Sequence, residues 1–139
     1  MSSRLRIAVL TLFCMTPTAQ GLADVTTLPI KALPAYLESH TDVVVQFTSP
    51  DPGCVYCVHA NAPFQAVSTR FDQRISFVRV QWAPWYRIPA EAKPFGIIAL
   101  PAQIAFKQGA RVHTQLGVIA QPARFAEQIS KVYDVPQKP

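Results

Sequence analysis

The sequence contains few cysteines, few glycines and few charged residues. Of its 139 residues, three are cysteine, five are glycine and 15% are charged, whereas half are hydrophobic. It has no repeats, low-complexity tracts or long runs of one charge, which excludes repeat architectures and charged tails. It also lacks a phosphate-binding loop and a dinucleotide fingerprint, so its partner is expected to be a protein rather than a metabolite. The length and hydrophobic content suit one compact domain.

The positive charges are scattered along the chain rather than gathered into a stripe. The net charge is +5, and the calculated isoelectric point is near 9.4. Two of the positive residues, Arg4 and Arg6, lie close to the start of the chain. Because no basic stripe interleaves with aromatic residues, we expect no nucleic-acid partner.

Residues 1–23 have the pattern of a secretory signal peptide. The two arginines just named precede a short apolar run over residues 7–15, and small residues allow cleavage after Ala23. The run is shorter than the ~20 residues of a membrane span, and an uncleaved anchor is the alternative. We therefore predict a signal peptide over 1–23 and one domain over 24–139, exported to a bacterial periplasm without stable membrane insertion after cleavage.

Cleavage after Ala23 would remove Cys14 and leave two cysteines, Cys54 and Cys57, in a C-x-x-C motif. Residues three apart share a helix face, with roughly 5–6 Å between their Cβ atoms, so the two thiols can close a disulfide. If a helix begins near Cys54, its free N–H groups and its dipole favour the thiolate of that residue. We therefore expect thiol–disulfide exchange in which Cys54 attacks and Cys57 resolves.

Other uses of a C-x-x-C motif fit this sequence less well. A static disulfide remains an open alternative. A closed zinc site needs four ligands, and the chain has no second C-x-x-C. Covalent haem attachment requires C-x-x-C-H, whereas Val58 follows Cys57 and the histidine comes one residue later, at His59. We predict no metal and no cofactor.

The order of the predicted elements indicates an α/β domain. Val43–Thr48 is apolar and rich in β-branched residues, which is typical of a buried central strand. The helix after the C-x-x-C carries apolar residues at three- and four-residue spacing, with Pro63 inside it. Around this pair we expect a helix over 28–40, a strand over 74–82, a short helix over 89–95, a hairpin of strands over 102–107 and 111–116, and a last helix from Pro122. A parallel strand–helix–strand unit followed by a hairpin implies a central mixed β-sheet with helices on both faces.

This order, with a C-x-x-C opening the helix after the central strand, resembles the thioredoxin family. The resemblance is strongest over residues 95–109, which are similar to the family's glycine, apolar residues, cis-proline, strand and Phe-Lys-x-Gly, and it extends over essentially all of residues 24–139. It implies a thioredoxin fold in which a cis peptide between Leu100 and Pro101 lies beside the two sulfurs. The backbone of Leu100 would pair with an extended partner segment, and Gly117 would lie close to the disulfide.

The sequence departs from the thioredoxin pattern around the reactive pair. Gln46 stands where the cytosolic reductases of the family have a buried carboxylate, which helps to move the proton of the second cysteine. Thr48 stands where they have a tryptophan, and the loop before the motif is longer than theirs. Val55 and Tyr56 replace their Gly-Pro dipeptide and are expected to tune the redox properties. Because this dipeptide carries no cation, we expect a moderately lowered pKa for Cys54.

Three aromatic residues follow the strand predicted beside the central one. Trp82, Trp85 and Tyr86 should approach the rim of the active site, where they could replace the missing tryptophan or form an apolar surface for a partner. Core packing is the preferred interpretation for Trp82, and for Trp85 both interpretations stay open. His59 is expected on the solvent-facing side of its helix.

Together, the residues and the resemblance predict an exported thiol–disulfide oxidoreductase. Its partners would be proteins that carry disulfides or dithiols, together with a partner that recycles its redox state, and the domain would be a monomer. The alternative is a non-catalytic thioredoxin-like binding module of an envelope or secretion assembly, with a structural disulfide. Gln46 and Thr48 lend this alternative some weight. A copper carrier is a third candidate, against which the position of Pro101 beside the sulfurs argues.

Overall fold

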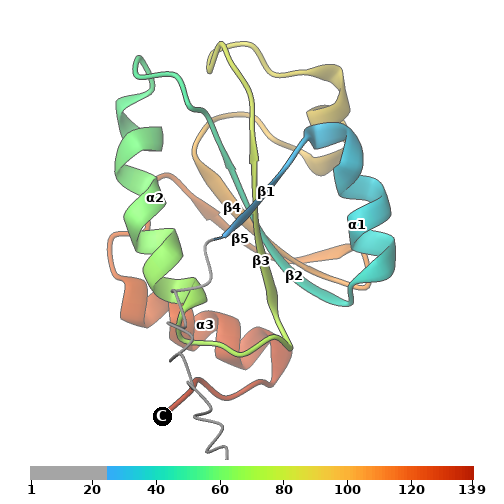
Figure 1. Cartoon of the computed structure of the whole chain (residues 1–139), viewed down its shortest axis with the longest axis vertical. Coiled ribbons are helices and arrows are strands. Elements are labelled where there is room, and N and C mark those ends of the chain that lie inside the picture. The colour runs from blue at the N-terminus through green and yellow to red at the C-terminus, as the bar shows by residue number, and fades with distance from the viewer. Residues whose placement is uncertain (1–24) are drawn as a thin grey trace, which may run out of the picture.

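In the computed structural model, which describes residues 25–139, helices cover both faces of one five-stranded sheet (Figure 1). The predicted signal peptide over 1–23 lies outside the described residues. No helix within 25–139 has the length and apolar character needed to span a membrane. In chain order, the elements are β1 (Thr26–Leu28), the 3-10 helix η1 (Ile30–Ala32), α1 (Leu33–Ser39), β2 (Asp42–Thr48), α2 (Val55–Ser68), β3 (Ser76–Gln81), the 3-10 helix η2 (Ala90–Phe95), β4 (Ala102–Lys107), β5 (Ala110–Leu116) and α3 (Pro122–Tyr133).

The sheet has the strand order β1-β3-β2-β4-β5, with β2 at its centre. Strands β1 and β2 both pair parallel to β3, whereas β4 runs antiparallel to β2 and to β5. A parallel pair requires a crossover connection, and α2 provides it between β2 and β3. The predicted mixed sheet with helices on both faces is confirmed.

The first strand differs from the prediction. The sequence predicts a helix over residues 28–40, whereas Leu28 ends β1 and the α-helix begins only at Leu33. Thr26, Thr27 and Leu28 pair in register with Val78, Arg79 and Val80 of β3. A strand of three residues is too short to show an alternation of apolar and polar side chains, so its pairing is set by tertiary contacts.

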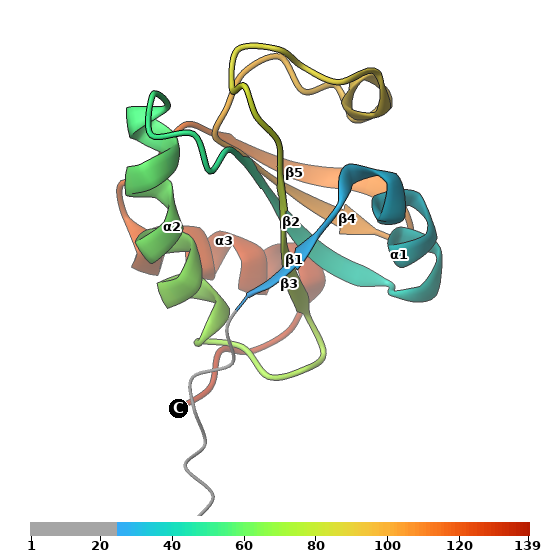
Figure 2. The same cartoon turned by 45° about the horizontal axis from the view of Figure 1, so that its top comes forward.

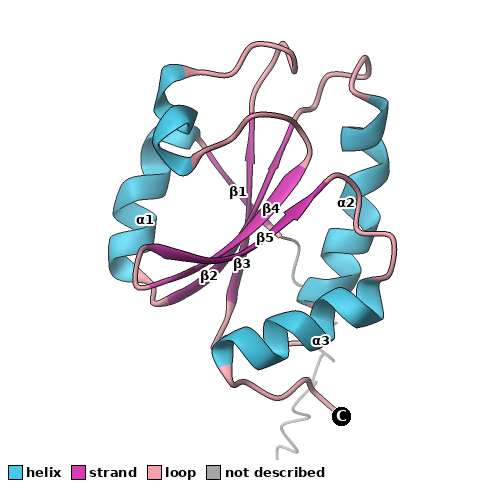
Figure 3. Ribbon diagram, turned by 180° about the vertical axis from the view of Figure 1, so that it is seen from behind, coloured by secondary structure: helices cyan, strands magenta, loops and turns pink. Residues whose placement is uncertain are grey.

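Two hydrophobic clusters hold the helices to the sheet. One lies between the sheet and α2 and α3, where Val44 and Ala105 of the sheet meet Phe64, Phe125 and Ile129, among others. The other lies on the opposite face, where β-strand side chains meet α1, η1 and the segment around η2. The views in Figures 2 and 3 show α2 and α3 on one side of the sheet and α1 on the other. Alternate residues of β2 therefore serve different clusters, as expected for a central strand.

Helix α2 is anchored by the apolar stripe that its spacing predicts. The side chains of Cys57, Ala60, Phe64 and Val67 are buried against the sheet. Pro63 lies inside the helix and has no N–H to donate to the preceding turn. The buried stripe fixes α2 over the sheet and so fixes the position of its first residues, which follow the carboxyl end of β2.

Helix α3 is bonded to the end of the sheet that lies away from the first residues of α2. The hydroxyl of Tyr133 donates to the carbonyl oxygens of Val43 and Phe106, at 2.9 and 2.8 Å. Burial raises the pKa of the Tyr133 phenol above its ordinary value, so the hydroxyl keeps its proton and remains a donor. These bonds tie the end of α3 to two strands of the sheet, β2 and β4.

Candidate functional site

Cys54 and Cys57 form a disulfide at the start of α2. The S–S distance is 2.01 Å, and the two Cα atoms are 5.2 Å apart. Cys54 is the N-cap residue of the helix, and its carbonyl oxygen accepts a hydrogen bond from the N–H of Val58 at 3.2 Å. The C-x-x-C motif therefore lies where the sequence analysis expects it, at a junction between loop and helix.

The loop over residues 49–53 holds Cys54 in this position by local hydrogen bonds. The Cys54 N–H donates to the carbonyl oxygen of Asp51 at 3.0 Å, and the Gly53 N–H donates to the Asp51 carboxylate at 2.8 Å. The Asp51 N–H in turn donates to the hydroxyl of Ser49 at 3.1 Å. Two prolines and a glycine prevent this segment from continuing β2, and the short polar side chains then close the turn.

The electrostatics of the helix start favour a negative charge on the first sulfur. The first turn of α2 contains no acidic side chain and no side-chain cap, so its N–H groups remain open toward Cys54. The helix dipole adds a partial positive charge at the same point. Cys57 lies on the buried side of the helix and is fully buried, while Cys54 is 5% exposed. Cys54 is therefore the better placed of the two to meet a partner sulfur.

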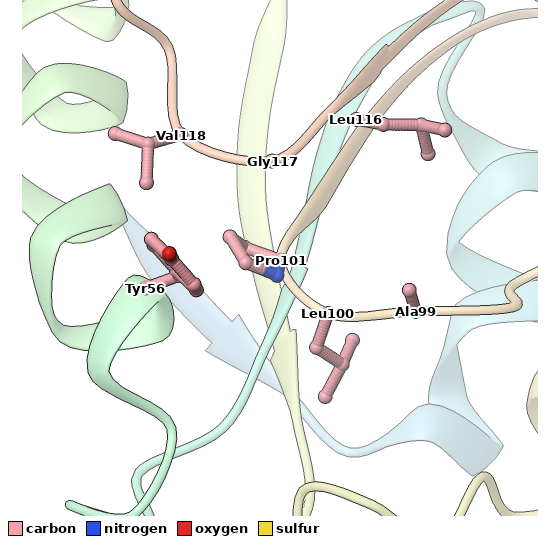
Figure 4. Close-up of a pocket in the computed structure, with 7 residues that line it drawn as sticks. All are labelled: Tyr56, Ala99, Leu100, Pro101, Leu116, Gly117 and Val118. Atoms are coloured by element: carbon pink, nitrogen blue, oxygen red, sulfur yellow. The ribbon is translucent and has the colours of Figure 1, made fainter.

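A shallow groove of about 340 Å³ lies beside the start of α2. Figure 4 shows Tyr56 of α2 facing Pro101 across this groove, with Gly117 and Val118 along a third side. Its lining is almost entirely apolar and consists of Tyr56, Ala99, Leu100, Pro101, Leu116, Gly117 and Val118. The structure thus brings together Tyr56, Leu100, Pro101 and Gly117, four of the residues named from the sequence.

The peptide between Leu100 and Pro101 is cis, as the family resemblance implies. A second cis peptide, between Ala83 and Pro84, was not predicted from the sequence. The N–H of Gly117 donates to the carbonyl oxygen of Pro101 at 2.9 Å, which joins the two loops of the groove. The backbone N–H and carbonyl of Leu100 have no hydrogen-bond partner within residues 25–139. This backbone is therefore available to an added strand.

The backbone conformation of Gly117 favours glycine. A Cβ atom at Gly117 would meet no heavy atom within 4 Å, but its φ angle is +74°, in the left-handed region. Glycine is favoured here by the backbone conformation, since L-residues with a Cβ rarely adopt a positive φ.

The aromatic residues after β3 divide between core and rim. Trp82 packs against the cluster beneath α1 and lies 6.3 Å, between ring centroids, from Phe47, which agrees with the preferred interpretation. Trp85 is 39% exposed, and its indole nitrogen lies 3.4 Å from the position of a Cβ atom built on Gly53. Tyr86 is 68% exposed and packs edge-on against Trp85. Trp85 and Tyr86 therefore lie at the rim of the site, next to the loop that carries Cys54.

Beneath α2, the position of the expected carboxylate carries a hydrogen-bonded amide. Gln46 is fully buried, and its Nε2 donates to the carbonyl oxygen of Ala60 at 3.0 Å. Its Oε1 accepts a hydrogen bond from Nε of Arg79 at 2.8 Å. Arg79 was not identified from the sequence, because its partnership with Gln46 depends on the register in which β2 pairs with β3. Side chains alternate between the two faces of a strand, and this alternation over residues 74–82 could have placed Arg79 on the face that α2 covers.

The side chains of two further candidates, His59 and Thr48, form no hydrogen bond with the residues around the disulfide within residues 25–139. His59 is exposed on the outer side of α2, in agreement with the expectation. Thr48 is buried, and its hydroxyl has no partner among the residues that the structure describes. Over the same residues, histidine, cysteine and acidic side chains nowhere form a group of three that could hold a metal ion.

Three solved structures with a similar fold are thioredoxins. No protein-family model and no curated protein sequence matches the chain. A reduced thioredoxin pre-protein from Schistosoma mansoni superposes with a TM-score of 0.62 at 26% identity, over 79% of this chain and 99% of that one. A single-residue mutant of a thioredoxin from Halobacterium salinarum gives a TM-score of 0.61 at 14% identity, over 77% and 90% of the two chains. Oxidized mitochondrial thioredoxin 3 from Saccharomyces cerevisiae gives 0.60 at 18% identity, over 77% and 94%.

The similarity to the last two proteins is a similarity of fold. The Schistosoma mansoni protein also shares about a quarter of its residues with this chain, over nearly its whole length. In this chain the fold carries a C-x-x-C at the start of α2, in the form of a closed disulfide. That combination supports thiol–disulfide chemistry in general terms. The chain has a thioredoxin fold.

Proposed function

We propose that the protein is an exported thiol–disulfide oxidoreductase that exchanges disulfides with protein partners. The observation that carries the proposal is the Cys54–Cys57 disulfide at the start of α2, bordered by an apolar groove around cis Pro101. A reversible disulfide needs a sulfur whose thiolate is stabilised and a surface on which a partner can be held beside it. Both features lie within the same loop cluster.

The reaction begins from the reduced pair. The Cys54 thiolate attacks one sulfur of a partner disulfide, the partner S–S bond breaks, and the second partner sulfur leaves as a thiolate that takes a proton from water. Cys57 then loses its proton and attacks the Cys54 sulfur of the mixed disulfide. The partner's remaining sulfur leaves, so the partner ends reduced and the Cys54–Cys57 disulfide is restored. The reverse sequence oxidises a partner dithiol.

The groove supports a partner that is a polypeptide rather than a small molecule. The open backbone of Leu100 can accept an extended segment by strand addition, and Tyr56 and Leu116 offer exposed apolar surface on either side. Trp85 and Tyr86 extend the apolar surface beyond the disulfide loop. A second protein would recycle the redox state of the pair between rounds.

The proposed location is a bacterial periplasm, and the proposed state is a monomer. The pattern of residues 1–23 supports export, because a basic start, a short apolar run and small residues before position 24 are the marks of a signal peptide. The cysteine count supports it as well, since removal of the leader would leave no unpaired thiol in an oxidising compartment.

A second candidate function follows from the burial of the pair. With Cys54 only 5% exposed and Cys57 fully buried, the disulfide could be a structural staple of a thioredoxin-like binding module. Such a module would serve an envelope or secretion assembly without catalysis. The two candidates differ in whether the disulfide exchanges with thiols in solution.

The test compares the residue 24–139 protein with Cys54→Ser and Cys57→Ser variants. The redox equilibrium is measured against glutathione buffers, and turnover is measured with a disulfide-containing protein substrate. We expect ready exchange for the parent, no exchange for Cys54→Ser, and a trapped mixed disulfide for Cys57→Ser, since the first step needs only Cys54. A parent disulfide that resists glutathione, or a Cys54→Ser variant with full activity, would instead support the structural module.

A further inference from the structure

Thr48 carries a buried hydroxyl that has no hydrogen-bond partner among the residues that the structure describes. It is the last residue of β2, and only 1% of it is exposed. Its carbonyl oxygen accepts a hydrogen bond from the N–H of Trp82 at 3.3 Å, so the hydroxyl is the polar group left over. Buried polar side chains in folded proteins nearly always have a partner, because an unpaired one bears the cost of leaving water. The position of this hydroxyl therefore calls for an explanation.

The side chain of Thr48 lies on the face of the sheet that α2 covers. Side chains alternate along a strand, so Thr48 shares its face with Val44 and Gln46. Val44 belongs to the same hydrophobic cluster as Phe64 of α2. Gln46 donates to the carbonyl oxygen of Ala60 in α2 at 3.0 Å. Thr48, two residues further along β2, therefore also points toward α2.

The contact between Gln46 and Ala60 indicates which part of α2 lies over Thr48. Helix α2 runs back along β2, because it connects two parallel strands (Figure 1). Two residues along β2, from Gln46 to Thr48, advance by ~6.6 Å. Three residues back along α2, from Ala60 to Cys57, advance by ~4.5 Å in the same direction. Cys57 is on the buried side of α2, so it is the helix residue that faces Thr48.

The neighbouring strands give Thr48 the same position independently. Phe47 pairs with Ala102 in the antiparallel register of β2 and β4, so the next step brings Thr48 opposite Pro101, which lines the groove beside the disulfide. On the other side, Gln81 of β3 is in register with Thr48, but no hydrogen bond joins the two side chains. The hydroxyl thus lies beneath the reactive pair.

Reduction of the disulfide creates a new hydrogen-bond donor in this buried place. Two glutathione thiols give up two electrons and two protons and become one glutathione disulfide, while the S–S bond of the protein breaks and Cys54 and Cys57 each gain an S–H. A disulfide sulfur has no proton to donate, whereas a thiol has one. Because Cys57 is fully buried, its S–H needs an acceptor from within the fold.

We infer that the Thr48 hydroxyl accepts a hydrogen bond from the S–H of Cys57 in the reduced protein and so favours the reduced pair. The inference rests on the proposed function, in which the disulfide opens and closes. In the oxidised protein the hydroxyl is unpaired, which raises the free energy of that state, and reduction removes this cost. A partner that is present in one state only shifts the equilibrium by about tenfold, which is ~30 mV for a two-electron couple. Thr48 thereby makes the disulfide a stronger oxidant than an apolar residue at this position would.

The experiment measures the equilibrium constant for reduction of the pair by glutathione. The protein is expressed from the full sequence with Cys14→Ser, so that Cys54 and Cys57 are the only cysteines whether or not the leader is removed. Thr48→Val replaces the hydroxyl with a methyl group of similar size and should lower the constant by about tenfold. Thr48→Ser keeps the hydroxyl and should restore most of the loss. Thr114→Val is the matched control, since it makes the same change at an exposed residue of β5 and should leave the constant unchanged.

The stabilities of the two redox forms separate this role from a structural one. Thr48→Val should leave the oxidised protein at least as stable in urea, because an unpaired hydroxyl is lost, and should make the reduced protein less stable. Equal losses in both forms, with an unchanged glutathione constant, would overturn the inference. An unchanged constant is also the result expected if a water molecule or Gln81 is the partner of Thr48 in both states.

A direct measurement covers the case in which Thr48→Val fails to fold. With Cys14→Ser and Cys54→Ser, Cys57 is the only thiol, and its S–H stretching band in the infrared moves to lower frequency when the S–H donates a hydrogen bond. A lowered band in this protein and in its Thr48→Ser variant would support the inference, whereas a band at the frequency of a free thiol would overturn it. Failure of the parent to exchange with glutathione would overturn the proposed function instead, and the infrared band, which needs no exchange, would still report on Thr48.

Discussion

The two ends of α2 are built in contrasting ways. At the reactive end, which comprises residues 49–57, 83–88, 98–101 and 116–118, large apolar side chains are open to solvent, including Tyr56 at 70% and Ile98 at 77% exposure. At the closed end, which comprises residues 64–71 and 129–138, Phe64 and Val67 are fully buried and the hydroxyl of Tyr133 bonds two carbonyls. Residues of one helix are thus buried at one end, whereas at the other end they expose apolar surface, where we propose that partners bind.

The same contrast holds for the backbone. At the closed end, α3 ends at Asp134 in a left-handed conformation, with the N–H of Val135 bonded to the carbonyl oxygen of Ser130 at 3.1 Å. At the reactive end, Leu100 keeps both backbone groups without a partner within residues 25–139. Regions that bind or react are often less fully satisfied than the rest of a fold, because function requires groups that can still form bonds. Substitutions at the two ends should therefore separate effects on stability from effects on disulfide exchange.

The largest expected effect is on the closed end, from Phe64→Ala. Phe64 is fully buried between α2 and the sheet, so its truncation removes apolar contacts and leaves a cavity. We expect a loss of ~3–5 kcal/mol in the free energy of unfolding, measured by urea denaturation. Tyr56→Ala on the same helix is the matched control and should change that free energy by less than ~0.5 kcal/mol, because the Tyr56 side chain is exposed. Equal losses in the two variants would mean that the two ends of α2 contribute equally to stability.

An intermediate effect is expected from Tyr133→Phe. This change removes only the hydroxyl and leaves the carbonyl oxygens of Val43 and Phe106 without that donor. The expected loss is ~1–3 kcal/mol in the free energy of unfolding. Exchange with glutathione should stay at the parent rate under conditions in which the variant is folded. A changed exchange rate in the folded variant would mean that the closed end communicates with the sulfurs.

The smallest effect on stability, but a selective effect on function, is expected from Trp85→Ala. Trp85 lies at the rim beside Gly53 and is partly exposed, so its loss should leave the thermal melting curve nearly unchanged. Exchange with a protein substrate should slow by on the order of fivefold in kcat/KM, as for a moderate aromatic contact in an interface. Exchange with glutathione, which does not need the extended surface, is the control. A simple loss of stability would count against a docking role.

Much of this arrangement could be predicted from the sequence because the signals are local. The buried strand Val43–Thr48, the turn rich in proline and glycine, and the apolar stripe of α2 each depend on neighbours in the chain. The cis peptide at Leu100–Pro101 could be predicted only through the family resemblance, and the one at Ala83–Pro84 was missed, since composition does not distinguish the two. The roles of Val55, Leu100, Gly117 and Trp85 in partner binding or redox tuning stay predictions.

The features that could not be predicted depend on contacts between residues that lie far apart in the sequence. The Gln46–Arg79 hydrogen bond exists because β2 and β3 pair in a register that sets these two residues opposite each other. Strand β1 is assigned by its pairing with β3 rather than by its own three residues. The groove combines α2 with the loops before β4 and after β5, so its volume and lining follow from tertiary packing. The sequence indicates that Gln46 departs from the thioredoxin pattern, but it does not indicate that Arg79 is its hydrogen-bond partner.

The crowding around Gly53 has a consequence for engineering. A Cβ atom there would lie 3.1 Å from the carboxylate oxygen of Asp51 and 3.4 Å from the indole nitrogen of Trp85. Position 53 is thus poorly suited to randomisation, although it immediately precedes Cys54. Val55 and Tyr56 project into solvent, at 57% and 70% exposure, so libraries that aim at a new reduction potential have room to vary there without disturbing the loop.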